Sequence, residues 1–508
     1  MVEMLEKWRH SCIFAGRKEI AMLCRKLFFV LGMAALCGVG AGRVREPLPC
    51  GPVPSERQLR WHEMEMYAFI HFTTTTYRDI EWGYGDAEPD EFRPDSLDCD
   101  QWAATLRAAG MKGVVITAKH HDGFCLWPSK ETDYSVKASS WRDGKGDVVA
   151  EMASAARRHG LLLGVYLSPW DRHDLRYGSP EYVDYFRAQL RELLTEYGPI
   201  FEVWQDGANG GDGYYGGACE RRIIDKNTYY GWDVTDSLIR SLQPWAAIFS
   251  DEGPDTRWCG TESGHVGATN WCTISRGHAP EGNGRFSWLQ QGEENGTDWV
   301  PAEVDVSIRP GWFYHASEDD KVKTAEQLMD IYYSSVGRGA NLILNVPPMP
   351  SGRLHPTDVV SLTAFGEALR REFAYPLLGK GTRIEASNVR GGSRRFAAGK
   401  LTDGRKDSYW ATDDSVRAAS VTIVMDGERE FNRLSLSEYL PLGQRVKAWR
   451  VEARQADGNW RQIAEGTTIG HKRLLRFDKV CADEVRISIT DAKACPCISE
   501  VQLFLSEE

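Results

Sequence analysis

The sequence predicts an α/β protein in which a (β/α)8-like barrel is followed by a C-terminal antiparallel β-sandwich. From residue 61 to residue 346, short apolar runs recur at roughly 35–50 residues with helical patterns between them, as parallel strands with crossover helices require. After residue 377 the runs become short and alternate apolar with polar residues. A doubly wound open sheet is the alternative for the first part, but no glycine fingerprint for a dinucleotide follows any strand.

Seven strands of the barrel can be placed from the apolar runs. The run at 113–118 is nearly all apolar, as expected for a parallel strand that is buried on both faces. An eighth strand is expected in the irregular region 263–300. The predicted strands are 66–71, 113–118, 161–167, the run that begins at residue 200, 246–250, 304–308 and 340–346; the predicted helices are 100–109, 146–159, 180–197, 233–242 and 323–334.

The C-terminal part reads as an antiparallel sandwich because its short alternating runs are separated by turn dipeptides. The runs are 420–424, 433–436, 449–453 and 485–489, and the turns are Asp426-Gly427 and Asp457-Gly458. We therefore expect three regions: a leader at 1–42, a barrel at 55–378 and a sandwich at 383–508.

The leader has the pattern of an export signal. Arg25-Lys26 precedes the apolar run Leu27–Val39, which is too short to span a bilayer, and Val39-Gly40-Ala41 supplies small residues for cleavage. No later run has the length of a transmembrane helix, so we expect a soluble periplasmic or secreted protein. The net charge of -11 argues against nucleic acid as a partner. Nine scattered cysteines follow the leader, and we expect mainly buried free thiols.

Polar residues gather where the predicted barrel strands end, and this is where barrel enzymes carry their active sites. His71 follows the first strand, His120-His121 the second, and Asp206 ends the fourth. We interpret Asp206 as a catalytic nucleophile; the alternative is a loop aspartate that caps the next helix. Adjacent histidines past a strand point in different directions, so the pair is a poor metal site and suits hydroxyl binding or loop bracing better.

Three motifs in the predicted barrel resemble those of a known family. Lys119-His120-His121-Asp122-Gly123-Phe124, Trp204-Gln205-Asp206-Gly207 and the segment 303–313, Glu-Val-Asp-Val-Ser-Ile-Arg-Pro-Gly-Trp-Phe, resemble glycoside hydrolase family 29, the α-L-fucosidases. Asn341-Leu342-Ile343-Leu344-Asn345 resembles the last barrel strand of this family. The resemblance covers residues 55–375 and implies a retaining exo-hydrolase that removes terminal L-fucose from glycans and requires no cofactor.

The resemblance also implies roles for individual residues. Asp206 stands in the place of the nucleophile, and Trp204 lies beside it in the fucose pocket. His71, His120 and His121 match the histidines that bind sugar hydroxyls. Further pocket residues by this resemblance are Glu81, Trp82, Tyr166 and Trp312.

The general acid/base is placed by a fourth segment. Residues 253–262 resemble the subgroup selective for α-1,3/1,4-linked fucose, in which Gly-Asn-Glu supplies this residue; that assigns it to Glu262, with Thr261 in place of the usual Asn. The residues alone leave Asp251, Glu252 and Asp255 as alternatives. In retaining enzymes the two carboxyl groups lie roughly 5–5.5 Å apart, one ionised and one protonated.

The C-terminal part has its own resemblance. Leu401-Thr402-Asp403-Gly404 and Tyr409-Trp410-Ala411-Thr412 are similar to the discoidin or coagulation-factor type C module, grouped with family 32 carbohydrate-binding modules. The resemblance implies a sandwich that can bind sugars through its loops and can hold a structural Ca²⁺. The alternative is a sandwich that only braces the barrel. For the whole chain, the alternatives to an α-L-fucosidase are a glycosidase of other specificity and a non-catalytic glycan-binding protein on the same scaffold.

Overall fold

The computed structural model describes residues 44–379 and 381–506. The predicted leader at 1–42 lies outside these residues. The chain divides into two units after Glu46, and the barrel and the sandwich both belong to the compact unit Pro47–Glu508. The helices described here are each too short or too polar to cross a membrane.

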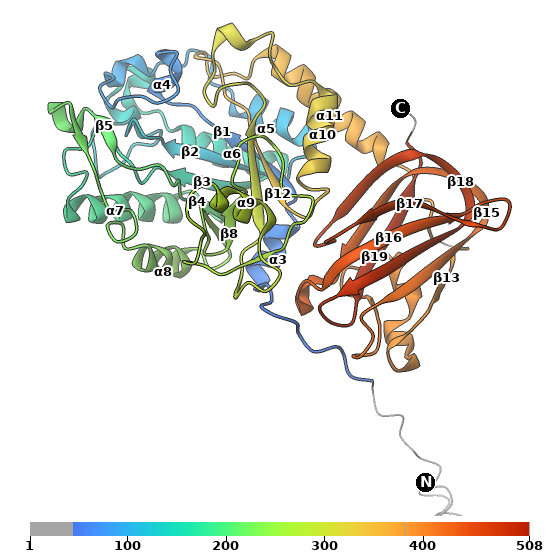
Figure 1. Ribbon diagram of the computed structural model, residues 1–508. Helices are drawn as coiled ribbons and strands as arrows, with labels where there is room; N and C mark the ends of the chain where they lie inside the picture. Colours follow the sequence, from blue (N-terminus) through green and yellow to red (C-terminus); the bar gives the residue numbers. More distant parts are fainter. Residues whose placement is uncertain (1–43, 380, 507–508) are drawn as a thin grey trace, which may run out of the picture. The chain divides into compact units, whose positions relative to one another are not determined.

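The larger part is a closed barrel of eight parallel strands, as predicted (Figure 1). Around the barrel the strand order is β1-β12-β11-β8-β7-β4-β3-β2. The strands are β1 (Met66–Ile70), β2 (Gly113–Lys119), β3 (Leu162–Leu167), β4 (Ile200–Trp204), β7 (Ala247–Ser250), β8 (Thr256–Trp258), β11 (Ala302–Ser307) and β12 (Asn341–Asn345).

The prediction for the eighth strand was wrong. It lies at β8, directly after β7, and not within 263–300. Phe249 of β7 pairs with Thr256 of β8, so only a short turn joins two neighbouring parallel strands. A three-residue strand without a helix before it leaves no apolar run and no spacing signal in the sequence. The region 263–300 instead holds helix α9 (Gly284–Gln291) and the pair β9 (Thr273–Ile274) and β10 (Asp298–Trp299).

Helices cover the outside of the barrel, and their ends carry the expected signals. In α6 (Val148–His159), the Asp147 side chain accepts the Ala150 N–H, and Gly160 ends the helix with a left-handed φ of 68°. The other helices are α3 (Glu56–His62), α4 (Thr74–Tyr77), α5 (Cys99–Ala108), α7 (Pro180–Glu196), α8 (Trp232–Leu242), α10 (Ala325–Ser334) and α11 (Pro356–Glu372). Helices α3, α4, α9 and α11 were not predicted from the sequence.

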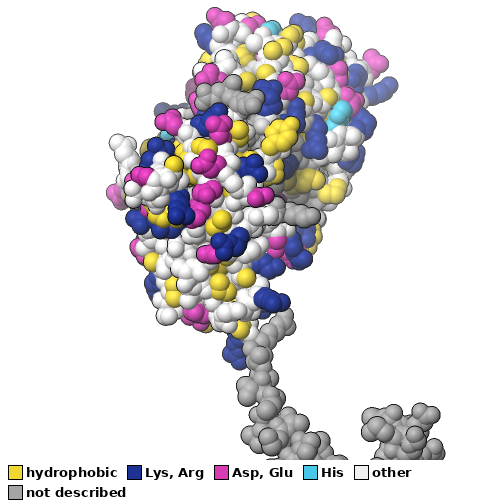
Figure 2. Space-filling model, turned by 90° about the vertical axis from the view of Figure 1, so that its right-hand side faces the viewer, with side chains coloured by type: hydrophobic (Ala, Val, Ile, Leu, Met, Phe, Trp, Pro, Cys, Tyr) yellow, Lys and Arg dark blue, Asp and Glu magenta, His cyan; other side chains and the backbone are white. Residues whose placement is uncertain are grey.

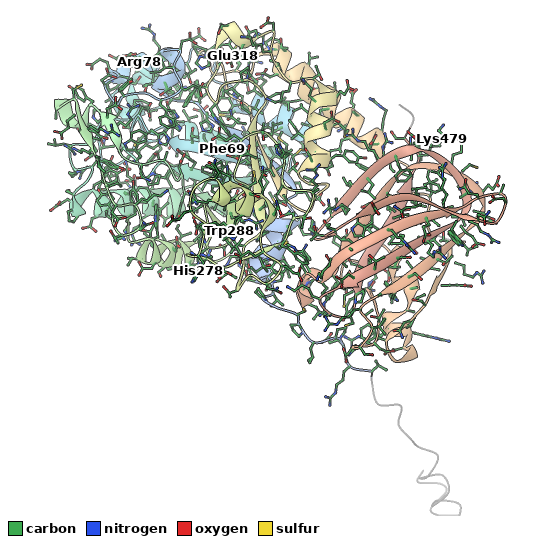
Figure 3. All side chains as sticks on the ribbon, viewed as in Figure 1. Phe69, Arg78, His278, Trp288, Glu318 and Lys479 are labelled. Atoms are coloured by element: carbon green, nitrogen blue, oxygen red, sulfur yellow. The ribbon has the colours of Figure 1, made fainter. Side chains whose placement is uncertain are left out.

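Alternation along each strand decides which side chains face the barrel interior. On β1, Met66, Ala68 and Ile70 pack in the large outer core, whereas Tyr67 and Phe69 belong to a separate inner cluster. Phe69 lies in the middle of the barrel in Figure 3. By the same alternation, the side chains of Glu202, Trp204 and Asp206 face the barrel interior. Asp206 follows the last residue of β4 and therefore lies at the carboxyl-terminal mouth of the barrel.

The C-terminal part is an antiparallel domain, as predicted. Its strands follow the order β14-β19-β15-β18-β16-β17, and β13 pairs with β15. The strands are β13 (Arg383–Ala386), β14 (Trp410–Ala411), β15 (Ala419–Glu438), β16 (Val446–Arg454), β17 (Trp460–Gly466), β18 (Arg473–Ala492) and β19 (Cys497–Phe504). On the face shown in Figure 2, cationic and acidic side chains are interspersed.

The predicted turn at Asp426-Gly427 was wrong. Both residues lie inside the single long strand β15, which joins the two separately predicted runs 420–424 and 433–436. The pairing of β15 with β18 shifts register between Val424 and Arg429, so the dipeptide marks an irregularity and not a chain reversal. Asp457-Gly458 does form the turn between β16 and β17.

The short hairpin β5 (Gly211–Gly213) and β6 (Glu220–Arg222) lies in the segment between β4 and α8, and so extends the loop that begins at Asp206. The nine cysteines from Cys50 onward are free, and six of them are buried.

Candidate active site

A cavity of about 260 Å³ opens at the carboxyl-terminal ends of the barrel strands. A cavity of about 150 Å³ already binds benzene, so this one has room for a sugar ring. Nine of the ten predicted site residues line it: His71, Glu81, Trp82, His120, His121, Trp204, Asp206, Glu262 and Trp312. The tenth, Tyr166, does not.

Both oxygens of the Asp206 carboxylate are held in place. Oδ1 accepts the backbone N–H of Ala208 at 2.7 Å, and Oδ2 accepts the Tyr166 hydroxyl at 2.9 Å. Burial raises the pKa of Asp206 to about 6, although both hydrogen bonds lower it; Asp251 and Glu262 raise it further through their charges. At neutral pH the group is therefore mainly an oriented carboxylate, as a nucleophile must be.

Tyr166 contacts the site through Asp206 and is not among the residues that line the cavity. Its ring is fully buried beneath the site, and only its hydroxyl acts there, through Asp206. The register of β3 and β4 pairs Tyr166 with Trp204. Trp204 is itself fixed, because its indole N–H donates to Glu303 at 2.9 Å and its ring stacks on Phe249 with centroids 4.0 Å apart.

Two of the three histidines have tautomers that their partners define. His71 Nδ1 lies 2.8 Å from the side-chain oxygen of Asn345, whose amide nitrogen donates to other acceptors, so Nδ1 carries the proton. His121 Nδ1 lies 2.7 Å from the hydroxyl of Ser168, which gives its own proton to a backbone carbonyl, so the same tautomer holds. In both rings Nε2 is the free acceptor.

All three imidazoles are neutral near pH 7. Burial lowers the pKa of His71 to about 4 and that of His121 to about 3, and it lowers the pKa of His120 well below the usual value. His121 Nε2 lies 3.7 Å from Asp206 Oδ2, which is too long for a hydrogen bond. Three neutral rings around one cavity are suited to binding hydroxyl groups and not to balancing a charge.

Glu262 reaches the cavity from the loop after β8. Its side chain is exposed, and its Oε2 accepts the indole N–H of Trp312 at 3.0 Å. Glu262 forms no ion pair with any described residue. An exposed carboxyl with one neutral donor and access to water can exchange protons during a reaction.

The other acidic candidates are committed to cations. Asp251 lines the cavity but pairs with Arg285 at 3.0 Å and with Lys226 at 3.7 Å. Glu252 pairs with the same arginine at 3.2 Å, and it lies outside the cavity lining.

Asp255 is also outside the cavity lining. It is buried, pairs with Arg240 at 2.5 Å and Arg57 at 3.4 Å, and accepts the N–H of Ile248. Its role is to join β7 to the surrounding helices.

Glu81 and Trp82 take different places at the mouth. The Glu81 carboxylate accepts the backbone N–H of Trp312 at 2.8 Å and bonds His315 at 2.6 Å, so its oxygens hold the loop after β11. The Trp82 side chain is 51% exposed and its ring meets that of His121 at a centroid distance of 5.4 Å. Glu81 therefore shapes the cavity through Trp312, whereas Trp82 presents a free aromatic face.

Several lining residues were missed by the sequence analysis. Asp305 is buried at the end of β11, accepts the Trp258 indole N–H at 2.9 Å, and has a pKa raised well above its usual value by burial and then by Glu262. Alternation along β11 places it on the same side as Glu303, a signal that the sequence did contain. The other missed lining residues are Phe69, Gly207, Ala208, Phe249 and Trp258.

In the part of the chain that the structure describes, no three His, Cys, Asp or Glu side chains are placed to hold a metal ion. The cavity instead combines an oriented carboxylate, a second carboxyl on a loop, neutral imidazoles and aromatic faces. On a (β/α)8 barrel, this combination defines a glycoside hydrolase of the two-carboxyl type.

Comparisons with known proteins give the family. The alpha-L-fucosidase family model matches residues 50–372, and the F5/8 type C domain model matches residues 383–501. The chain therefore belongs to the α-L-fucosidases of glycoside hydrolase family 29 and carries a C-terminal F5/8 type C domain.

Relatives and solved structures agree over most of the chain. Alpha-L-fucosidase 1 of Arabidopsis thaliana is 43% identical over 94% of this chain and 93% of its own length. A glycoside hydrolase 29 member from an unknown rumen bacterium is 47% identical, with a TM-score of 0.80 over 91% of this chain and 78% of that one. A Ruminococcus gnavus fucosidase solved with fucose is 32% identical, with a TM-score of 0.82 over 92% and 98% of the two chains.

Proposed function

We propose that this α-L-fucosidase acts by double displacement, with Asp206 as nucleophile and Glu262 as general acid/base. The observation that carries the proposal is that both carboxyl groups line one cavity, while Asp251, Glu252 and Asp255 are tied to cationic partners. An ion-paired carboxylate has no proton to give, and a general acid must hold one.

In the first step, the Asp206 carboxylate attacks the anomeric carbon of fucose and the bond from that carbon to the aglycone oxygen breaks. The proton of Glu262 goes to the departing oxygen. In the second step, Glu262 takes a proton from water, the water oxygen attacks the anomeric carbon, and the ester bond to Asp206 breaks. Two inversions retain the configuration of the sugar.

The proposed ligand of the cavity is a terminal fucose residue. The related R. gnavus enzyme was solved in complex with fucose. Trp204, Phe249 and Phe69 supply apolar faces for the ring carbons, and the histidine acceptors suit its hydroxyl groups. The linkage that we propose is α-1,3 or α-1,4, because the segment 253–262 that delivers Glu262 resembles the subgroup with that selectivity.

The linkage is tested by comparing a Lewis-type trisaccharide with 2'-fucosyllactose and p-nitrophenyl fucoside. We expect cleavage of the branched trisaccharide with a much higher kcat/KM than that of the α-1,2 linkage. Equal or faster cleavage of 2'-fucosyllactose would overturn the linkage proposal while leaving the fucosidase activity intact.

The roles are tested by chemical rescue with azide. We expect Asp206→Gly to lower kcat by about four orders of magnitude. Azide then enters from the side of the missing nucleophile, so the product is β-fucosyl azide. Glu262→Ala should lower turnover most for poor leaving groups, and azide should then give α-fucosyl azide, because it attacks the fucosyl-enzyme from the opposite side.

The matched control is Glu252→Ala, which removes a carboxyl of the turn between β7 and β8 that lies outside the cavity lining. Its turnover should stay within a few-fold of the wild type. Normal turnover of Glu262→Ala, or the same azide anomer from both variants, would refute the assignment of the two roles.

A further inference from the structure

A second cavity of about 600 Å³ adjoins the active-site cavity. Trp82, Gly207 and Ala208 line both, so the two spaces meet along these three residues. A ligand whose terminal sugar fills the first cavity can extend past Trp82 into the second. The second cavity thus lies where the remainder of an oligosaccharide would continue.

The floor of the second cavity is the loop that follows the proposed nucleophile. Gly207 permits a close approach there, because a Cβ at this position would lie 2.3 Å from Asp251 Oδ1. Gly211 has a φ of +103°, and a Cβ there would lie 3.2 Å from the Trp170 ring. The hairpin β5–β6 then brings Arg221 opposite Asp212. The aromatic side of the cavity is formed by Trp82, Tyr84 and Trp170.

The lining carries more positive than negative charge. Its cationic side chains are Arg172, Arg221 and Lys226, and its only carboxylate among the described lining residues is that of Asp212. Asp212 lies 3.4 Å from Arg172, and Arg172 is buried, hydrogen-bonded to backbone carbonyls and placed 4.0 Å from the Tyr84 ring centre. These two charges therefore belong to the framework of the cavity.

The other two cations are exposed to solvent. The Arg221 side chain is exposed and makes no hydrogen bond or ion pair with the residues that the structure describes. Lys226 is 43% exposed, and its nearest carboxylate is Asp251 at 3.7 Å. Arg221 has no counter-charge among the described residues, and Lys226 has only the 3.7 Å contact with Asp251, an exposed pair that an anionic ligand can compete for. Both lie beside aromatic faces in a chain whose net charge is -11, and they raise the local concentration of anionic ligands. A neutral sugar would need hydrogen-bond partners but no such excess of charge.

We infer that the second cavity binds the aglycone and that Arg221 and Lys226 recognise an anionic group on it, a carboxylate or a sulfate ester. The preferred substrates are then acidic fucosylated oligosaccharides. This inference rests on the proposed function, because it requires the terminal fucose to occupy the first cavity.

The test uses the full-length enzyme and three Lewis-type substrates that differ only on the galactose: the unsubstituted trisaccharide, its sulfate ester, and the tetrasaccharide that carries N-acetylneuraminic acid. At low ionic strength we expect kcat/KM for the better anionic substrate to exceed that for the neutral one by about five- to tenfold, the scale of two solvent-exposed ion pairs. Comparison of the sulfated with the carboxylated substrate shows which anion is recognised. The preference should shrink as salt is added.

The variant is Arg221→Ala combined with Lys226→Ala. It should abolish the anionic preference while kcat/KM for the neutral trisaccharide and for p-nitrophenyl fucoside changes less than about twofold. Arg394→Ala combined with Arg461→Ala, at exposed sites on the sandwich, controls for the loss of two positive charges and should keep the preference. Equal kcat/KM for all three Lewis-type substrates in the wild type, or an equal loss on all of them in the variant, would overturn the inference.

Failure of the linkage proposal can be distinguished from failure of the anion-binding inference. If the α-1,2 linkage is cleaved and the Lewis-type substrates are not, the same neutral and anionic comparison is made on 2'-fucosyllactose and its acidic derivatives. The ratio within one linkage tests the cavity, and the ratio between linkages tests the proposed function.

Discussion

At the scale of single residues, the environment of Asp206 sets the pH at which the enzyme works. Its carboxyl must be ionised to attack, and burial raises its pKa to about 6. Protonation therefore removes the nucleophile as the pH falls through this value. We expect the acid limb of the kcat/KM profile to have an apparent pKa of about 6, measured with p-nitrophenyl fucoside.

Two substitutions should move this limb in opposite directions. Tyr166→Phe removes a hydrogen bond that lowers the pKa of Asp206, so the limb should shift to higher pH and kcat/KM should fall about tenfold or more. Asp251→Asn removes a neighbouring negative charge that raises the same pKa, so the limb should shift to lower pH. Shifts of both variants in the same direction would show that another group controls the limb.

At the scale of secondary-structure elements, alternation along the strands explains why so much of the site was predictable. A strand that ends at Trp204 with an inward side chain must send Asp206 inward as well, and the same rule places His71 beyond Phe69. The rule needs a recognisable strand. β8 is too short to be recognised, so Trp258 was missed.

Contacts between distant residues could not be predicted. Glu81 forms hydrogen bonds with the loop that begins at Trp312, more than two hundred positions later in the chain, and no local pattern encodes that partner. Tyr166 was expected at the cavity wall because the resemblance gives a residue's place in the chain. It does not show that the Tyr166 ring is fully buried and that its hydroxyl contacts Asp206.

The strand elements β4 and β11 also bury two carboxyl groups beneath Trp204. Glu202 accepts the Trp61 indole N–H at 2.9 Å, and Glu303 accepts the Trp204 indole N–H at 2.9 Å and the Tyr67 hydroxyl at 2.7 Å. Burial raises the pKa of both groups, and the charge of Glu303 raises that of Glu202 further. The other oxygen of Glu202 is buried and has no hydrogen-bond donor among the described residues, so its ionised form is poorly compensated.

A raised pKa in the folded state means that Glu202 stabilises the fold fully below its unfolded-state pKa, and that this contribution is lost as the pH rises. Glu202→Gln mimics the protonated form and does not titrate. We therefore expect its free energy of unfolding to improve relative to the wild type between about pH 5 and pH 8, as measured by urea denaturation. The control is Glu56→Gln on α3, whose side chain is 68% exposed; it should change the free energy of unfolding by less than about 1 kcal/mol.

At the scale of the whole molecule, a buried ion pair joins barrel and sandwich within the unit Pro47–Glu508. Glu372 of α11 lies 2.5 Å from Arg433 of β15, and the two side chains are 9% and 8% exposed. The same carboxylate accepts the hydroxyls of Tyr333 and Ser506, each at 2.7 Å. This arrangement supports a bracing role for the sandwich whether or not its loops also bind sugar.

Removing the carboxylate would leave the Arg433 guanidinium buried without its counter-charge. We expect Glu372→Gln to lower the free energy of unfolding by about 3 kcal/mol at neutral pH, with little change in kcat. Asp330→Asn breaks a second pair between barrel and sandwich, to Arg476, whose side chains are 65% and 33% exposed; this control should cost less than about 1 kcal/mol.

The free energy of unfolding that Glu372 contributes should also depend on pH. It should be lost as the pH falls, whereas the contribution of Glu202 is lost as the pH rises. Burial raises the pKa of Glu372, but the hydrogen bonds from Arg433, Ser506 and Tyr333 outweigh it and leave the pKa below its usual value. The stabilisation is thus present above the unfolded-state pKa and is lost as the pH falls through the lower folded-state value. The wild type and Glu372→Gln should converge in urea denaturation below about pH 4, because the wild-type carboxyl is then increasingly protonated. A difference that stays constant down to that pH would mean that packing, and not the charge, joins the two parts of the molecule.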